Sequence, residues 1–215
     1  RFPYRYHPVE RWEGQTHIFD RMCKVVEQRG IKVKDKSPLL LAAEKQKVKV
    51  EKWIAQNLET KKPFVLLHAG SSRSRPEKRW PYFEQLAYHL DNNGFEIVWI
   101  GGPDDTAIND QLASAVGIDA TGSFTILELA ELGRKANFAV TNDSGPMHIL
   151  SASGIPVFGL FGPSSKQKNH ALGQKNRALA VVENWHASLR PPQASLSNLS
   201  LDSVIKKISE DGLLI

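Results

Sequence analysis

Short apolar runs alternate with segments of helical periodicity from about residue 63 onward. The apolar runs predict strands over 64–68, 95–100, 137–141, 156–161 and 178–182, and the helical spacing predicts helices over 82–92, 106–115, 126–135, 146–153 and 201–210. Because the predicted strands are apolar on both faces and are separated by helices, the pattern is typical of a parallel sheet covered on both sides. We therefore predict an α/β fold with a doubly wound parallel sheet.

The leading segment, residues 1–62, has a different pattern. Helical spacing predicts helices over 16–29 and 39–58, and Lys61-Lys62-Pro63 marks a candidate boundary. This segment holds 15 Lys and Arg against 8 Asp and Glu, whereas the whole chain has a net charge of +5. A basic segment of this kind is suited to binding an anionic membrane surface or nucleic acid. It is also typical of a solvated helical face with no partner. No RNA-binding or zinc-finger pattern occurs, so we expect no nucleic-acid partner.

Composition narrows the class of protein. The 215 residues, 41% hydrophobic and 24% charged, can bury a core of ordinary size, and no apolar run reaches the roughly 18 residues of a membrane span. A single cysteine, Cys23, cannot form an internal disulfide or a thiolate zinc site. We therefore expect a cytoplasmic protein with neither a metal nor a cofactor. Because the chain begins at Arg1, we expect a piece of a longer protein or a processed one.

The loop after the first predicted strand carries candidate phosphate-binding groups. Gly70 permits close approach of the backbone, Ser71 and Ser72 offer hydroxyl and N–H groups, and Lys78 adds a charge suited to a diphosphate. Ligands of such folds bind at the carboxyl ends of the strands, where this loop lies. The Gly-x4-Gly-Lys spacing of a P-loop is missing, and the loop could also be an ordinary turn.

A second candidate loop follows the strand predicted at 137–141. Asp143 or Ser144 can cap the next helix, but a cap does not explain His148, one turn into that helix. Gly145 offers a bare backbone N–H at the helix entry. Asp104 and Asp105, which follow Gly101-Gly102-Pro103, either face the same edge of the sheet or only cap the helix predicted from residue 106. No Gly-x-Gly-x-x-Gly follows a strand, so the residues favour a phosphorylated, nucleotide-bearing ligand over a nicotinamide.

Four motifs in order resemble glycosyltransferase family 9, the lipopolysaccharide heptosyltransferases. They are Lys78-Arg79-Trp80-Pro81, the segment 97–103 ending in Gly-Gly-Pro, Thr141-Asn142-Asp143-Ser144-Gly145-Pro146-Met147-His148, and Phe161-Gly162-Pro163-Ser164-Ser165. The last two look most like the ADP-heptose:lipopolysaccharide heptosyltransferase II branch. The resemblance implies a GT-B architecture of two Rossmann-like domains. Residues 63–215 would then be the carboxyl-terminal nucleotide-sugar-binding domain, and residues 1–62 a helical interdomain segment or the end of the amino-terminal domain.

The resemblance also implies roles for individual residues. Ser71 and Ser72 would lie at the donor phosphates, Lys78 would pair with the diphosphate, and Asp143 would hold heptose hydroxyls. The rest of the donor site would comprise the N–H groups of Ser144 and Gly145, His148, Phe124 against the adenine, and Asp104 near the nucleoside, with Pro103 as the alternative equivalent. The sequence departs from the family in a longer first loop, 73–77, and in a Lys-rich segment, 164–174.

The activity implied is inverting transfer of heptose from ADP-heptose to the lipopolysaccharide inner core. Lys78 and His148 would act on the leaving diphosphate by charge and position. The family's general base is an Asp early in the amino-terminal domain, and nothing in residues 1–62 matches it. We expect action at the inner face of the inner membrane, with peripheral contact to it. Two alternatives stay open: a non-catalytic sugar-nucleotide-binding domain, or another GT-B enzyme such as a sugar-nucleotide epimerase.

Overall fold

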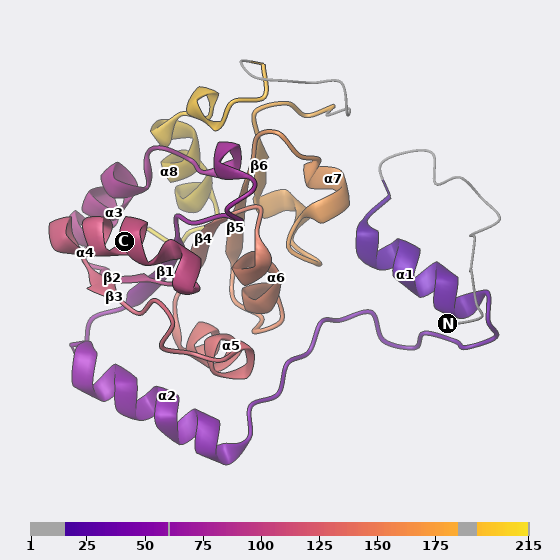
Figure 1. The fold of residues 1–215 in the computed structure, drawn as a ribbon, viewed down its shortest axis with the longest axis horizontal. Helices are drawn as coiled ribbons and strands as arrows, with labels where there is room; N and C mark the ends of the chain where they lie inside the picture. The colour runs from indigo at the N-terminus through magenta and orange to yellow at the C-terminus, as the bar shows by residue number, and fades with distance from the viewer. Residues whose placement is uncertain (1–15, 60, 185–192, 215) are drawn as a thin grey trace.

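Six parallel strands form one sheet in the computed structural model, which describes residues 16–59, 61–184 and 193–214 (Figure 1). The strands are β1 (Phe64–His68), β2 (Glu96–Trp99), β3 (Ile118–Asp119), β4 (Ala139–Asn142), β5 (Val157–Phe161) and β6 (Ala178–Ala180). Their order across the sheet is β3-β2-β1-β4-β5-β6, with every neighbouring pair parallel. This is the Rossmann order, in which the chain reverses its winding between β1 and β4. The predicted doubly wound α/β fold is confirmed.

Alternate strand residues build two apolar layers, because successive side chains point to opposite faces of a sheet. On one face, Val65 and Leu67 pack in a cluster with residues of α3 (Phe83–Asn92), α4 (Thr106–Ala115) and α8 (Leu201–Glu210). On the other, Phe64 and Leu66 pack with residues of α5 (Ile126–Lys135) and α6 (Gly145–Ser151). The strands are therefore covered on both sides.

Helix α2 (Glu44–Asn57) packs along α5, below the sheet in Figure 1. Val50 is fully buried there, and the Lys49 ammonium lies 2.9 Å from the Glu128 carboxylate of α5. Trp53 meets Phe124 edge to face, with ring centroids 5.2 Å apart. Part of the basic leading segment is thus attached to the sheet body. The domain boundary after residue 62 stays a prediction.

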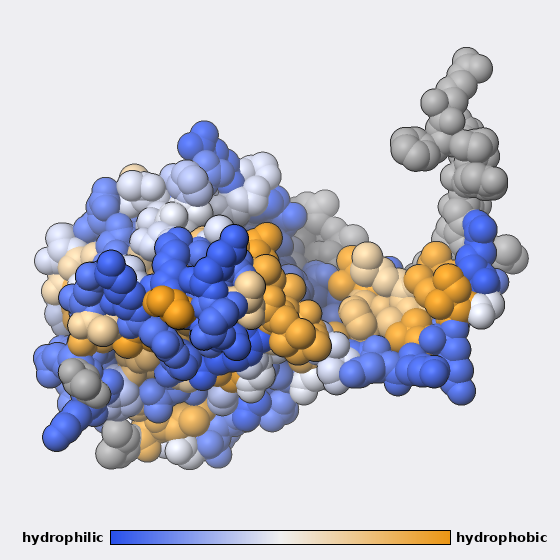
Figure 2. Space-filling model, turned by 90° about the horizontal axis from the view of Figure 1, so that it is seen from below, coloured by the Kyte–Doolittle hydropathy of each residue, from blue (hydrophilic) through white to orange (hydrophobic). Residues whose placement is uncertain are grey.

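Helix α1 (Ile18–Glu27) lies to one side of the body and is joined to α2 by an extended stretch (Figure 1). Its side chains at Ile18, Met22 and Val26 form an exposed apolar face, part of the orange surface at the right of Figure 2. His17, at its amino end, meets His170 with ring centroids 4.3 Å apart. No helix in the described ranges is both long and apolar enough to cross a bilayer.

Most predicted elements match the observed ones within two residues, and three differ. The helix predicted from residue 39 begins at Glu44, because the Gln46 side chain accepts the Ala43 N–H at 2.8 Å and sets the cap there. Strand β3 was not predicted, since two residues give no periodic signal. The segment 164–174, expected to be irregular, contains the short helix α7 (Lys166–Asn169).

The carboxyl-terminal segment covers the start of α3. Trp80 is 2% exposed, and its indole N–H donates to the Leu199 carbonyl at 2.8 Å. The Tyr82 hydroxyl donates to the Ser197 carbonyl at 3.2 Å. Residues near the carboxyl terminus therefore fix the position at which the loop after β1 leads into α3.

Candidate functional site

The loops after β1 and β4 leave the sheet at the point where its winding reverses. Asn142 ends β4 and is fully buried; its amide donates to the carbonyls of Ala69 and Gly70 at 2.9 and 3.0 Å. Its side-chain oxygen accepts the Trp80 N–H at 3.1 Å. One side chain thus holds the two loops in register, so that their polar residues face each other across the switch point.

Lys78 and Asp143 form an ion pair between these loops. Lys78 ends the 3-10 helix η1 (Pro76–Lys78) of the first loop, and its ammonium lies 2.6 Å from Asp143 Oδ2 and 3.4 Å from the Asp143 carbonyl oxygen. The side chains are 18% and 7% exposed, so solvent screens the pair only partly. The fold therefore brings together the cation and the carboxylate that the sequence singled out.

Two hollows open beside this pair at the carboxyl edge of the sheet. The first hollow, about 340 Å³, is lined by Ser72, Arg75, Lys78, Asp143, Ser144, Gly145, His148 and Asn169. The second hollow, about 310 Å³, is lined by His68, Ser71, Ser72, Gly102, Pro103, Asp104, Asp105, Ser144, Gly145 and Pro146. They share Ser72, Ser144 and Gly145. Eight of the nine residues predicted to bind the donor line one or the other.

The two serines of the first loop differ in their surroundings. Ser71 is buried, and its hydroxyl donates to the Arg75 carbonyl at 3.0 Å while accepting from the Arg79 guanidinium at 3.2 Å. Ser72 is exposed, and its hydroxyl lies 3.0 Å from that of Ser74. Both hydroxyls make contacts inside the loop, but only that of Ser72 is exposed where a ligand can reach it.

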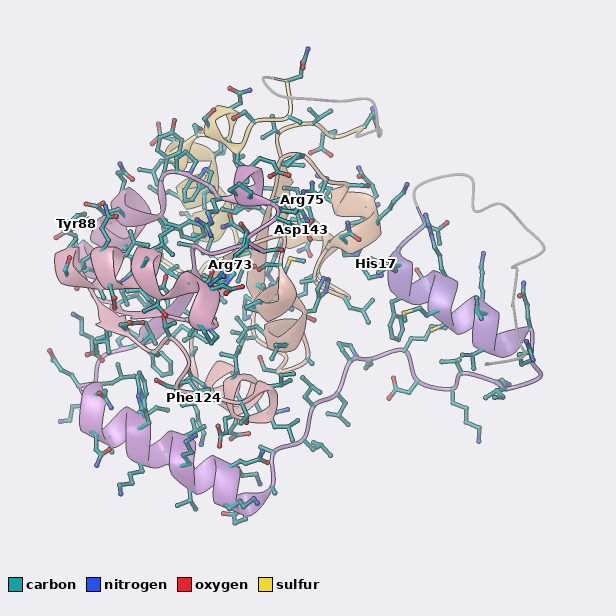
Figure 3. The ribbon with its side chains drawn as sticks, viewed as in Figure 1. His17, Arg73, Arg75, Tyr88, Phe124 and Asp143 are labelled. Atoms are coloured by element: carbon teal, nitrogen blue, oxygen red, sulfur yellow. The ribbon has the colours of Figure 1, made fainter. Side chains whose placement is uncertain are left out.

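Two arginines of the longer first loop, Arg73 and Arg75, lie on this side of the molecule (Figure 3), and Arg75 lines the first hollow. Arg73 forms an ion pair at 2.8 Å with Asp104, which lines the second hollow. Arg75 pairs with Glu77 and donates to the Pro163 carbonyl at 3.4 Å. The extra residues of this loop thus place two arginines beside the site, each of them paired with an acidic side chain.

Ser144 and His148 belong to the start of α6. Ser144 occupies the N-cap position, yet its side chain makes no capping hydrogen bond and instead lies 3.0 Å from His68 Nδ1. The His148 side chain reaches solvent, yet neighbouring protein atoms remove part of its hydration. Desolvation lowers the pKa of His148 below its usual value, against the opposing charge of Asp143, and the nearby His17 and Lys78 lower it further. His148 is therefore mainly neutral near pH 7.

Phe124 does not line either hollow. It precedes α5 and packs against Trp53 of α2, apart from Asp143 in Figure 3. Its contact with an adenine ring stays a prediction. A larger hollow, about 420 Å³, lies at the opposite end of β1, lined by residues of α2 and α5 and by Pro63 and Phe64, and contains none of the predicted donor residues.

His68 is a site residue that the sequence did not single out, and its partner Asp105 is one of the two acids after Gly101-Gly102-Pro103 that were expected to face this edge or to cap the next helix. His68 ends β1, and its Nε2 lies 3.3 Å from Asp105 Oδ2. Asp105 does not cap α4 with its side chain; its Oδ2 accepts the Gly102 N–H at 3.0 Å. A polar residue at the end of an apolar strand was the available signal for His68. Within the described part of the chain, no group of three or more His, Cys, Asp or Glu could hold a metal ion.

Comparison with known proteins identifies the family. A doubly wound sheet with charged groups at its switch point is typical of nucleotide-binding domains. The chain belongs to glycosyltransferase family 9 (heptosyltransferase), whose family model matches residues 4–199. It is 27% identical over 175 residues to lipopolysaccharide heptosyltransferase 2 of Salmonella typhimurium, covering 73% of this chain and 50% of that protein. The chain spans about half the length, or less, of the curated heptosyltransferases 2 that it matches.

Solved structures agree with the fold. The crystal structure of a family 9 glycosyltransferase from Veillonella parvula matches 95% of this chain and 62% of that one, with a TM-score of 0.78 and 26% identity. The E. coli ADP-heptose lipopolysaccharide heptosyltransferase II matches 80% of this chain and 53% of that one, with a TM-score of 0.66 and 24% identity. The sheet described above is therefore that of the family's GT-B fold.

Proposed function

We propose that the protein transfers heptose from ADP-heptose to the lipopolysaccharide inner core with inversion, and that this chain supplies the donor-binding half. Membership of family 9 supports the reaction class. ADP-heptose and lipopolysaccharide are named for a structure with the same fold, the E. coli heptosyltransferase II. The observation that carries the proposal is the Lys78–Asp143 pair at the switch point, which offers a cation to a diphosphate and a carboxylate to sugar hydroxyls.

The donor's diphosphate fits the first hollow. There the Lys78 ammonium, the exposed Ser72 hydroxyl and the Gly145 N–H surround one space. His148, neutral near pH 7, contributes as a hydrogen-bond partner rather than as a charge. Ser71 acts through its backbone or after the loop rearranges, because its hydroxyl bonds within the loop.

The nucleoside fits the second hollow, which continues from the first. Asp104 lies on its rim in an ion pair with Arg73, so a ligand that uses Asp104 must compete with that pair. Phe124 precedes α5 and is half-buried against Trp53, and the part of its ring that stays exposed is the part that would meet an adenine.

The chemistry follows from the charges at the site. An acceptor hydroxyl attacks the anomeric carbon, the bond to the diphosphate breaks on the opposite face, and ADP leaves with added negative charge. Lys78 stabilises that charge in the transition state, where it is larger than in the bound donor. The attacking hydroxyl also needs a base. We propose that the base comes from residues outside this chain, so that the 215 residues alone bind donor without transferring heptose.

The setting proposed is the cytoplasmic face of the inner membrane. Residues 1–62, with 15 basic against 8 acidic side chains, suit contact with an anionic surface near a lipid-linked acceptor. Vesicle binding that weakens with added salt is the expected behaviour of such a contact.

Thermal unfolding with different nucleotides tests the function. We expect ADP-heptose and ADP to raise the midpoint of this chain and UDP-sugars to leave it unchanged, because a ligand stabilises only the folded state that binds it. Stabilisation by UDP-sugars instead would favour another GT-B enzyme, such as an epimerase. Donor binding by a longer protein that transfers no heptose would favour a non-catalytic domain. Heptose transfer by these 215 residues alone would refute the proposal that the base lies outside this chain.

A further inference from the structure

Arg75 is a second cation of the first hollow, with no role in the function proposed above. Its side chain lines that hollow together with Lys78, which comes three residues later in the chain. Arg75 occupies the N-cap position of η1 and Lys78 ends that helix. Side chains three residues apart in a 3-10 helix lie on the same face, so one short turn directs both cations to the same space.

The backbone of Arg75 is fixed before any ligand binds. Its N–H donates to the Ser72 carbonyl at 2.8 Å, and its carbonyl accepts the Lys78 N–H at 3.1 Å and the Ser71 hydroxyl at 3.0 Å. Because these bonds already order the turn, a ligand that uses Arg75 does not have to order this part of the loop, and less conformational entropy is lost on binding.

Two partners hold the guanidinium of Arg75. Its Nε donates to the Glu77 carboxylate, and its Nη2 donates to the Pro163 carbonyl at 3.4 Å. Glu77 and Pro163 line a third hollow, of about 350 Å³, and neither of them lines the first hollow. The two bonds thus anchor the guanidinium at the border of the first hollow while leaving the hollow itself open to a ligand.

The remaining N–H groups of Arg75 are suited to a phosphate. The guanidinium is planar and carries its N–H donors in a fixed fork geometry. Within the described part of the chain, Nη1 has no hydrogen-bond partner. The N–H groups of Nη1, together with the second N–H of Nη2, therefore form an unused fork, and such a fork binds a phosphate group at two oxygen atoms.

The charges in the first hollow leave a need for this second cation. Lys78 lies 2.6 Å from Asp143, so its charge is already partly offset, whereas each phosphate group of a sugar nucleotide carries a negative charge. Burial raises the pKa of Glu77, but the hydrogen bond and charge of Arg75, with the charge of Lys78, hold it below its ordinary value, so Glu77 is ionised near neutral pH. The Arg75 side chain is 45% exposed, and solvent screens its ion pair with Glu77.

The placement of Arg75 indicates which phosphate it meets. The two donor hollows share Ser72, Ser144 and Gly145, but Arg75 lines only the first. With the nucleoside in the second hollow, the phosphate attached to it lies near the shared residues. The phosphate farther from the nucleoside then lies beyond them, in the part of the first hollow that Arg75 lines.

We propose that Arg75 binds the sugar-bearing phosphate of the donor, the one farther from the nucleoside, through the fork formed by its Nη1 and Nη2 N–H groups. The inference rests on the function proposed above, because it takes the ligand to be a sugar nucleotide. Arg75 keeps its bonds to Glu77 and Pro163 while the ligand is bound, since those bonds use other N–H groups. Arg75 thus makes the site prefer a nucleoside diphosphate over a monophosphate.

Calorimetric titration of the whole chain with ADP and with AMP tests this role. The measured quantity is the ratio of the two affinities, because AMP lacks the phosphate that Arg75 is proposed to bind. Arg75→Gln should lower the preference for ADP over AMP by about 5- to 30-fold, the loss expected for charged hydrogen bonds that solvent partly screens. Arg75→Lys should also have a lower preference than the wild type, because an ammonium cannot hold the Pro163 carbonyl and two phosphate oxygens at once. A wild-type preference in Arg75→Lys would overturn the two-point contact.

Arg73→Gln is the matched control. Arg73 belongs to the same loop, is 78% exposed, pairs with Asp104 at 2.8 Å and lines none of the three hollows. Its loss removes the same charge, and the release of Asp104 acts on the nucleoside, which ADP and AMP share, so the ratio of affinities should stay within twofold of the wild type. A ratio for Arg75→Gln within twofold of that for Arg73→Gln would overturn this inference alone. Failure of the wild-type chain to bind ADP would overturn it together with the proposed function.

Discussion

Replacing Lys78 with alanine tests the site at its centre. The ammonium lies 2.6 Å from the Asp143 carboxylate and is 18% exposed, so it is held in place before any ligand arrives. A hydrogen bond between a charged donor and a phosphate contributes about 1.5–3 kcal/mol. Its loss should raise the Kd for ADP about 10- to 150-fold. Asp143, left without its counter-charge, also repels the phosphates, which favours the upper half of that range.

The assay is calorimetric titration of this chain with ADP at moderate salt. Lys62→Ala is the matched control, because Lys62 also forms an ion pair, with Asp91 at 3.3 Å, and lies outside both donor hollows. It removes the same charge from the protein, so it reports any effect of net charge alone. An ADP affinity for Lys78→Ala within twofold of that of Lys62→Ala would refute the phosphate role of Lys78.

Three further predictions concern the sugar contact, acid stability and close packing. Asp143→Asn should lower the affinity for ADP-heptose relative to ADP, because an amide binds sugar hydroxyls less strongly than a carboxylate; titrations giving an unchanged ratio contradict this. Burial raises the pKa of Glu128, but Lys49 and Thr125 more than offset it, so the stabilising effect of Glu128 is lost as the pH falls below about 4.5. Urea unfolding should therefore show a smaller loss between about pH 5 and pH 3 for Glu128→Gln than for the wild type. Gly70→Ala should lower the melting temperature, because its Cβ would lie 2.8 Å from Asp105 Oδ2 and closer still to Oδ1; an unchanged value contradicts this packing.

The sequence predicted the sheet well because its signals are local. Strand 64–68 and helices 106–115, 126–135 and 201–210 have the predicted bounds, since each is set by a run of apolar residues or by a cap within a few positions. Strand β3 had no such signal. The start of α2 depends on one hydrogen bond, in which the Gln46 side-chain oxygen accepts the Ala43 N–H, and the apolar residues at 39–41 favoured an earlier start.

The site was predictable only in part, for a related reason. Lys78 and Asp143 belong to motifs that can be read in a single stretch of sequence. The contacts of His68 with Asp105 and Ser144 join residues 37 and 76 positions apart, and they follow from strand order rather than from spacing. Neither partner of His68 could be named before the order β2-β1-β4 was known.

The bond from Trp80 to Leu199 has a consequence for synthesis of the protein. These residues are 119 positions apart, and ribosomes add about 5–20 residues per second, so Trp80 waits roughly 6–24 s for its partner to be made. Strand β1 is translated before that interval begins, and the other five strands are translated within it. The hydrogen bond from the Trp80 indole to Leu199 therefore becomes possible only after every strand of the sheet has been made, whereas the partners Asn142 and Asp143 of the same loop are available earlier.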